Sequence, residues 1–512
     1  MVAAENDALP KGKVGGIGDV IRDIPKYLAL SNQQVSVITP GYLFQSTFHY
    51  AEHLFDFDVT FAGQKEKVQL FKLHLDGTSG VSQFVLEHEL FANAGIGNIY
   101  CDDGADRPFA SDATKFALFS TAVCELLKQH WHSYYDVIHL HDWHSAFIAL
   151  HRALNPEFKI LQKMRCVYTV HNLALQGTRP FADDPSSFQA WFPNLNVEQG
   201  LIVDPQYSNC INPARAGINL SDAVHVVSPT YATEIVKPSN EALGFIGGEG
   251  LECDLQRIAG EKKLFGILNG CQYDIKLPKK QSMPKFISQM KDVLMQWMAK
   301  HAQVTSAHLI AFERLTRWQT EKNSTGPLVT SVGRLTLQKV ALLMEHDQQQ
   351  LALASVLDII KDSKGRLIIL GSGDPVLEQQ MTALMAEYDH FVFLNGYNDA
   401  LSQAIYVQGD LFLMPSSFEP CGISQMLAMR AGQACLVHEI GGLKDTVQHG
   451  KTGFCFSGEN KIEQISSLKI ELTHALHLYS HDKKAWQQIS DNAQKLRFTW
   501  QNSIQQYISS LY

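Results

Sequence analysis

The sequence predicts an α/β protein with two Rossmann-like domains that face a cleft. Three observations lead to this fold class. The chain has 512 residues, which is too long for one hydrophobic core. Short apolar runs alternate with helical patterns, and the alternation restarts in the second half. Most of these runs end in glycine, polar or charged residues, as expected where parallel strands reach the ligand-binding edge of an open sheet.

The composition excludes several classes of function. A net charge of −9 argues against nucleic acid as the main partner, because binding a phosphate backbone needs a basic face. There is no apolar run of membrane-spanning length and no signal peptide, so we expect neither a membrane span nor secretion. The nine cysteines form no CxxC pair, which indicates reduced thiols in the cytoplasm. Residues 1–4 resemble the tail of a first strand, so we expect the natural chain to begin earlier.

The first glycine-rich stretch, residues 11–19, lies between that short strand and a helix. An apolar face at helical spacing begins at Ile17 and continues to Leu28. The glycines let the backbone approach a ligand closely, and Lys13 supplies a point charge for a phosphate. The string lacks the ending of a P-loop, and Ile21 stands where the dinucleotide motif needs a small residue. The residues alone therefore leave open a phosphate loop and an ordinary turn.

Two strands of the first half end in histidine. One runs from 136 to 140 into His141 and Asp142, and the other runs from 167 to 170 into His171. His139, His141 and His144 resemble a metal site, but no matching carboxylate cluster accompanies them, so we expect no metal. Asp142 and His141 are expected instead to order the cleft by hydrogen bonds. Two polar strand ends in one domain favour a shared cleft.

The remaining elements follow the same alternation. Further strands are expected at 35–38, 84–86 and 223–230, and a strand pair is expected between about 63 and 80. Residues 265–270 close this half, with a hinge near 240–270, and a polar linker with a helix follows at 272–326. The second half adds strands at 328–332, 367–370, 391–394, 411–414 and 434–437. Arg334 and Lys339 follow the first of these strands, where they suit an anionic group, although a solvated surface turn is the plainer alternative.

Glu419 stands in a turn between the strand at 411–414 and a helix that begins near residue 425. The amides of Cys421, Gly422 and Ile423 should lie unpaired at the start of that helix, where they can receive an anion or a sugar oxygen. A carboxylate beside such amides suits a polyol joined to a phosphate. A helix-capping glutamate is the plainer alternative.

Eight strings, in order along nearly the whole chain, resemble the bacterial glycogen synthase and plant starch synthase family, which uses ADP-glucose. They are KVGGIGDV (13–20), HDWHS (141–145), TVHNLALQG (169–177), SPTYATEI (228–235), GRLTLQK (333–339), GSGDP (371–375), SSFEPCGISQ (416–425) and GGLKDTV (441–447). A single string would carry little weight, but eight in the family's order are highly specific.

The resemblance implies a glycosyltransferase fold of the B type. Residues 1–245 would form an acceptor-side Rossmann-like domain, 265–490 a nucleotide-sugar domain, and 491–512 a helix that crosses back to the first domain. The implied reaction adds one glucose from ADP-glucose to the non-reducing end of an α-1,4-glucan, with retention at the anomeric carbon and without metal or cofactor. ADP-glucose and glycogen would be the partners.

The resemblance also implies residue roles. His171 is similar to the family histidine beside the sugar, Glu419 to the carboxylate that faces the glucose hydroxyls, and Arg334 with Lys339 to the pair that neutralises the diphosphate. The remaining residues that the resemblance implies in substrate binding are Lys13, Gly15, Gly16, Asp19, Asp142, Asn172, Gln176, Asn269, Tyr397 (stacked on the adenine), Cys421, Gly422 and Ser424.

The sequence departs from the family pattern at several positions. None of these changes removes a residue to which the resemblance assigns a charged role. Leu175, Ser417, Val340 and Ser424 replace an aromatic residue, an arginine, a small residue and a threonine that are frequent in the family. Two alternatives stay open: a retaining transferase of the same fold with another donor or acceptor, and a non-catalytic glucan-binding paralogue. A nicotinamide oxidoreductase is disfavoured because its fingerprint fails.

Overall fold

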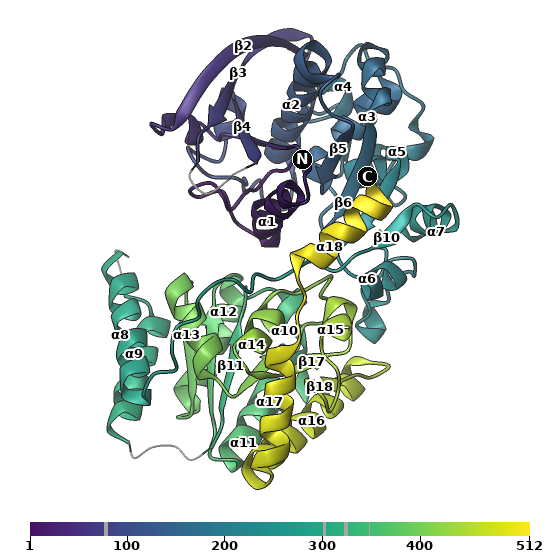
Figure 1. Cartoon of the computed structure of the whole chain (residues 1–512). Coiled ribbons are helices and arrows are strands. Elements are labelled where there is room, and N and C mark those ends of the chain that lie inside the picture. Colours follow the sequence, from purple (N-terminus) through teal and green to yellow (C-terminus); the bar gives the residue numbers. More distant parts are fainter. Residues whose placement is uncertain (76–79, 301–303, 322–325, 348) are drawn as a thin grey trace. The chain divides into compact units, whose positions relative to one another are not determined.

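The computed structural model describes residues 1–75, 80–300, 304–321, 326–347 and 349–512, and it divides into two compact units (Figure 1). The first unit consists of Met1–Ser239, Gly247–Gly270 and Trp500–Tyr512. The second unit consists of Asn240–Ile246 and Cys271–Thr499. The last thirteen residues of the chain thus pack with its first half.

The first unit is built on two four-stranded groups, in the orders β1-β4-β3-β2 and β10-β9-β6-β5. Val2 joins them, because it forms parallel bridges to Ile38 of β1 and Leu140 of β5. The parallel part of this sheet therefore has the Rossmann order, with residue 2 as its first strand. The strands are β1 (Val35–Pro40), β2 (Ala51–Phe61), β3 (Gln64–Leu73), β4 (Val81–Glu87), β5 (Val137–His141), β6 (Arg165–Val170), β9 (Ala223–Val226) and β10 (Leu264–Gly266), with a separate pair β7 (Arg179–Pro180) and β8 (Cys210–Ile211).

Helices flank this sheet. The C-terminal helix α18 packs on α1, and Trp500 and Ile504 share a buried cluster with Val20 and Ile24. Apolar residues at helical spacing along α1 explain this contact. The helices of the first unit are α1 (Gly16–Leu30), α2 (Ala110–Leu126), α3 (Phe147–Leu154), α4 (Phe188–Trp191), α5 (Pro213–Leu220), α6 (Pro229–Glu234), α7 (Glu252–Gly260) and α18 (Trp500–Gln506), which ends in a π turn, Tyr507–Leu511.

The second unit has a parallel six-stranded sheet in the order β15-β14-β11-β16-β17-β18. This is also the Rossmann order, with β11 and β16 on the two sides of the point where the order reverses. Strand β16 is fully buried, as expected for a parallel strand covered on both faces. The strands are β11 (Leu328–Val332), β14 (Arg366–Gly371), β15 (Phe391–Asn395), β16 (Leu411–Met414), β17 (Ala434–His438) and β18 (Gly453–Phe456), with a small hairpin β12 (His346–Asp347) and β13 (Gln350–Leu351).

Residues 272–326 contribute more to the second unit than the predicted linker and helix. Two helices form there, and Phe286, Leu294 and Leu315 are buried in the core of the unit. Apolar residues at helical spacing within a polar stretch account for them. The helices of this unit are α8 (Met283–Lys300), α9 (Ser306–Thr320), α10 (Leu337–Met344), α11 (Ala352–Asp362), α12 (Pro375–Glu387), α13 (Asp399–Gln408), α14 (Ser424–Arg430), α15 (Gly441–Thr446), α16 (Lys461–His481) and α17 (Lys483–Lys495).

Candidate active site

The segments that follow β11 and β16 hold the charged site residues predicted for the second unit, namely Arg334, Lys339 and Glu419. Because β11 and β16 are neighbours at the reversal point, the loop from Gly333 and the loop from Pro415 start at the same edge of the sheet. The amide of Ser417 donates to the carbonyl of Gln338 at 2.9 Å, which ties the two loops together. Gly371 lies against the first loop, and a β-carbon there would stand 1.9 Å from the carbonyl oxygen of Gly333.

Lys339 and Glu419 form an ion pair at this edge. The Lys339 Nζ contacts the Oε2 of Glu419, and the Ser416 hydroxyl donates to the same oxygen at 3.2 Å. The Glu419 side chain is only 6% exposed, and a carboxylate buried to this extent needs such polar partners. The His438 ring bonds to the carbonyl of Ser416 at 2.9 Å and holds that turn in place. The carboxylate is therefore fixed and presented beside a cation.

Arg334 differs from Lys339 because it is exposed and has no ion-pair partner among the described residues. A guanidinium held near a strand end without a carboxylate is available to an anionic ligand. The structure therefore brings Lys339, in the first turn of α10, together with Glu419 and leaves Arg334 open on the loop between β11 and α10.

The turn after Glu419 has the geometry that its sequence predicts. Gly422 has a φ of +74°, and a β-carbon there would meet the Gln425 side chain at 2.6 Å. The Gln425 amide in turn donates to the carbonyls of Cys421 and Gly422. Within the described chain, the amides of Gly422 and Ile423 donate to no other group. Two of the three predicted amides thus remain available to a ligand. Ser424 is the first residue of α14.

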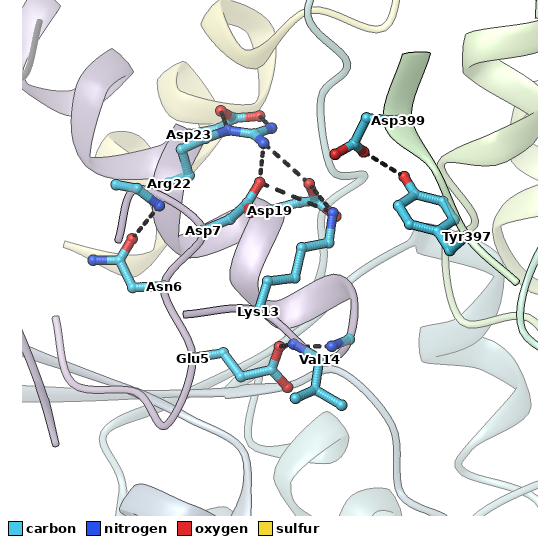
Figure 2. A network of polar contacts seen from close by, with 12 residues as sticks. Glu5, Asn6, Asp7, Lys13, Val14, Asp19, Arg22, Asp23, Tyr397 and Asp399 are labelled. Atoms are coloured by element: carbon cyan, nitrogen blue, oxygen red, sulfur yellow. Dashed lines mark hydrogen bonds and ion pairs between the residues drawn. The ribbon is translucent and has the colours of Figure 1, made fainter. Parts of the chain in front are cut away.

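Tyr397 follows β15 at the same edge of the sheet as the β11 loop. Its side chain is 56% exposed, and its hydroxyl donates to Asp399 at 2.8 Å (Figure 2). The hydroxyl is thus held by Asp399 while more than half of the side chain is exposed.

The glycine-rich loop of the first unit is held by a buried carboxylate. The Oε2 of Glu5 accepts the amides of Val14 at 2.8 Å and Gly15 at 2.6 Å (Figure 2). Its Oε1 accepts the Tyr100 hydroxyl at 2.8 Å. The amide of Gly15 is therefore occupied by the protein itself. The amide of Gly16, at the start of α1, bonds to none of the residues that the structure describes. Sequence analysis missed Glu5, whose only signal is a charged residue directly after a buried strand.

Lys13 on this loop belongs to a network of charges. Its Nζ lies 2.7 Å from the Asp19 carboxylate and 3.9 Å from that of Asp7, and Arg22 contacts both carboxylates (Figure 2). Burial raises the pKa of Asp7, and Lys13 and Arg22 partly oppose that shift. Lys13 thus shares its carboxylates with a second cation, which leaves part of its charge to act on a ligand.

His171 and Asp142 meet at the ends of β6 and β5. The Oδ1 of Asp142 accepts the amide of His171 at 2.7 Å, and the His141 Nδ1 lies 3.0 Å from the His171 Nε2. Asp142 thus bonds to the backbone of His171, and His141 to its ring. Burial raises the pKa of Asp142 to about 7, although amide donors from His171 and Asn172 oppose the shift. Burial lowers the pKa of His171 to about 3, so its ring is neutral.

The three predicted amide side chains have different surroundings. Asn269 is buried, and its Oδ1 has no hydrogen-bond partner in the described part of the chain. Asn172 accepts the amide of Ala174 at 2.9 Å. Gln176 is used within the protein, because its amide group donates to the carbonyls of Leu173 and Glu249 and accepts from Asn212. Gln176 therefore holds loops together, whereas Asn269 keeps an acceptor for a ligand.

The histidines near β5 do not assemble a metal centre. Among the described residues, no group of three or more histidine, cysteine or carboxylate side chains could hold a metal ion. Within that same part of the chain, none of the helices has the length and apolar character needed to cross a membrane.

Comparison with known proteins adds family evidence to this geometry. The model of the starch synthase catalytic domain matches residues 1–257, and that of glycosyl transferases group 1 matches residues 312–495. The chain is 32% identical over 99% of its length to the glycogen synthase of Streptococcus sanguinis strain SK36, of which it covers 98%. It is 31% identical over 98% of its length to the glycogen synthase of Lactiplantibacillus plantarum, of which it covers 97%.

Two solved structures resemble the chain. The catalytic domain of Starch Synthase IV from Arabidopsis thaliana, bound to ADP and acarbose, has a TM-score of 0.75 and 26% identity, with 99% of this chain and 97% of that one covered. Sucrose-phosphate synthase from Thermosynechococcus elongatus, at 15% identity and a TM-score of 0.55, shares the fold, with 100% of this chain and 97% of that one covered. These matches confirm the predicted glycosyltransferase fold of the B type.

Proposed function

The chain belongs to the family of starch synthase catalytic domains and is a glycosyltransferase; from this premise we propose that it is a glycogen synthase that uses ADP-glucose. In this reaction the bond between C1 of glucose and the diphosphate oxygen breaks. The 4-hydroxyl oxygen at the non-reducing end of an α-1,4-glucan bonds to C1 with retention, and the hydroxyl proton is released with ADP. The curated relatives named glycogen synthase and the ADP bound to Starch Synthase IV support this choice.

The observation that carries the proposal is the edge of the second unit at β11 and β16. There, Lys339 is paired with a buried Glu419 while Arg334 is open. A departing diphosphate needs cations where negative charge develops, and such electrostatic stabilisation is usually the largest contribution to catalysis. Glu419 can accept hydroxyls of glucose, and the amides of Gly422 and Ile423 can donate to its oxygens or to phosphate. Tyr397 is proposed to stack on the adenine.

The first unit supplies the remaining proposed contacts. His171 would bond to the reacting sugar, and Asp142 would hold the backbone that carries it. The unsatisfied acceptor of Asn269 supports a role in binding a hydroxyl or amino group. Lys13, Asp19 and the amide of Gly16 are proposed to meet the nucleotide sugar and the end of the glucan.

The test is a donor comparison. The purified protein is incubated with glycogen and either ADP-glucose or UDP-glucose, and both the released nucleoside diphosphate and the glucose incorporated into glycogen are measured. We expect transfer from ADP-glucose to dominate. Transfer from another donor, or to a small acceptor alone, would show a different transferase of this fold. Binding to glycogen without any turnover would show a non-catalytic paralogue.

We also propose that the protein acts in the cytoplasm without a metal cofactor. All nine cysteines are free thiols, which supports a reducing compartment. Transfer activity that survives dialysis against a chelator is the expected outcome, and its loss with recovery on adding a divalent cation would contradict this part of the proposal.

A further inference from the structure

A row of buried imidazoles extends behind His171 in the first unit. His141 bonds to His171, and the rings of His141 and His139 stack with centroids 4.4 Å apart. His139 is bonded on its other sides to Thr169 and to Tyr512 of the C-terminal segment. The proposed reaction uses only His171, so the function of the other rings is open.

The proton positions in the outer part of this row follow from one carbonyl. The His225 Nε2 lies 3.1 Å from the carbonyl of Ile267, which can only accept, so Nε2 carries the proton. Its Nδ1 then accepts the hydroxyl of Thr169 at 2.9 Å, and Thr169 accepts Nε2–H of His139 at 2.6 Å. The His139 Nδ1 therefore accepts the hydroxyl of Tyr512 at 2.7 Å. Both rings are neutral, because burial lowers the pKa of His139 well below its usual value and that of His225 to about 4.

The pair His141 and His171 has two possible arrangements. Both rings are neutral, since burial lowers both pKa values, so one proton lies between the two nitrogens. If His171 donates from Nε2, the His141 proton must lie on its own Nε2. That atom is buried and has no hydrogen-bond partner in the described part of the chain, so an N–H donor would be left unsatisfied. Buried N–H groups without an acceptor are rare in proteins.

We propose that His141 is a positioning residue that donates its Nδ1 proton to the Nε2 of His171 and thereby fixes His171 as the tautomer protonated on Nδ1. The bare Nε2 of His141 then faces the interior without an unsatisfied proton. The backbone of His171 is held at the same time by Asp142. The ring is thus fixed in both orientation and proton position.

The consequence concerns what His171 offers to a ligand. Its Nδ1 bonds to no described residue, and in this tautomer Nδ1 is an N–H donor. A sugar hydroxyl or a phosphate oxygen can accept that bond, whereas a group that only donates cannot. This consequence for catalysis rests on the proposed function, but the tautomer itself does not.

The first test reads the tautomer directly. The full chain is labelled with ¹⁵N-histidine, and the ring nitrogens of His171 are assigned by the signals that disappear in the His171→Ala variant. We expect a pyrrole-like Nδ1 and a pyridine-like Nε2 for His171 near pH 7.5. A protonated Nε2 would overturn the proposal, whatever donor sugar the protein uses.

The second test uses two substitutions of His141 that place an amide differently. In His141→Asn the amide nitrogen falls near the position of Nδ1 and can still donate to His171, whereas the longer side chain of His141→Gln reaches toward Nε2. We expect the asparagine variant to keep most of the turnover and the glutamine variant to lose up to about 100-fold, as misplaced catalytic groups do. Equal losses in both variants, at equal Tm, would overturn the positioning role.

His151→Gln is the matched control for the loss of a buried imidazole. His151 lies on α3, is buried and bonds to Thr121 of α2 at 3.1 Å. It forms no bond to the histidines behind His171 that the structure describes. We expect it to lower Tm and leave turnover unchanged. If the wild-type protein transfers no glucose, the proposed function fails, and the ¹⁵N measurement alone decides the proposal on His141.

Discussion

The two units use the same sheet order but keep their polar groups in opposite states. At the ends of β5 and β6 in the first unit, His141 and Asp142 are buried and His171 is partly buried, and burial shifts the pKa of each so that the neutral form is favoured. Beyond the ends of β11 and β16 in the second unit, Lys339 and Glu419 form an ion pair and Arg334 is exposed. The ends of β5 and β6 therefore present neutral hydrogen-bonding groups, whereas the β11 and β16 edge presents charges. The ion pairs of Lys13 in the first unit lie on its glycine-rich loop, not at these strand ends.

This difference matches the chemistry of a nucleotide sugar. Glucose and a glucan end are neutral, and oriented neutral donors and acceptors recognise them without the desolvation cost of a buried charge. A diphosphate is anionic, and cations near its departing oxygen lower the barrier. We infer that the ends of β5 and β6 in the first unit recognise the sugar and that the cations Arg334 and Lys339 of the second unit recognise the phosphate.

Acidification should destabilise the first unit more than the second. A buried histidine with a lowered pKa contributes stability above the unfolded value near 6.5, and this stability is lost as the pH falls toward the folded pKa. Each such histidine accounts for about 1.4 kcal/mol per pH unit, so four of them give roughly 5 kcal/mol per pH unit. In the first unit, burial lowers the pKa of four histidines to about 3 or 4, namely His144, His151, His171 and His225. In the second unit, burial lowers the pKa of His438 to about 4.

Hydrogen exchange followed by mass spectrometry at pH 7.5, 6 and 5 measures this effect for each unit. We expect β5, β6 and β9 to lose protection below about pH 6, while β11, β14 and β16 keep it. Equal loss in both sheets at one pH would contradict the claim that neutral buried imidazoles are concentrated in the first unit.

Removal of the Lys339 cation should have the next largest effect, on rate. We expect Lys339→Ala to lower kcat by about 10²–10³, or about 3–4 kcal/mol, because a charge that stabilises the leaving group is lost. Lys461→Ala is the control, since it removes another cation of the same unit, paired with Glu345 on the surface. Steady-state kinetics with ADP-glucose and glycogen measure both variants. Near-normal turnover of Lys339→Ala would remove this residue from the reaction.

Asp142→Asn should change how stability depends on pH. Burial raises the Asp142 pKa from 3.8 to about 7, so its contribution is present at low pH and is lost as the pH rises through about 7. Asparagine keeps the acceptor for the His171 amide and does not ionise. The variant should therefore gain stability relative to wild type between pH 4 and 7, by at most about 1.4 kcal/mol per pH unit. Urea unfolding of both proteins from pH 5 to 8 measures the difference, and a constant difference would contradict the neutral state of Asp142.

The sequence predicts the parts of the fold that depend on local patterns. The runs at 328–332 and 411–414 coincide with β11 and β16, because buried parallel strands are continuous apolar segments. The run at 453–456 escaped sequence analysis, because it is short and opens with a glycine. At 272–326 the sequence predicts a polar linker with one helix, whereas two helices, α8 and α9, form there and each buries only one face.

The site was predictable in residue type and strand position but not in its pairings. Lys339 and Glu419 are both placed at strand ends by the sequence, yet their bond joins residues 80 positions apart and depends on the sheet order. Likewise, Glu5 takes the Gly15 amide and Gln176 bonds to Glu249, so a loop that resembles a ligand site is partly filled by the protein. Such contacts depend on how distant loops meet, which no local pattern records.

Tyr512→Phe should have the smallest effect on stability. It tests the row of buried imidazoles at His139, whose ring stacks on that of His141. The substitution keeps the ring and removes the hydroxyl that donates to the His139 Nδ1 at 2.7 Å. A buried acceptor then loses its partner, which costs about 1–3 kcal/mol, and the charged site of the second unit is untouched. Urea unfolding should show this loss, and hydrogen exchange should confine it to β5 and β6. Lys339→Ala should behave in the opposite way, with a large loss of rate and little loss of protection in those strands. If Tyr512→Phe instead lowered kcat as much as Lys339→Ala does, the separation of a neutral hydrogen-bonding site from a charged one would not hold.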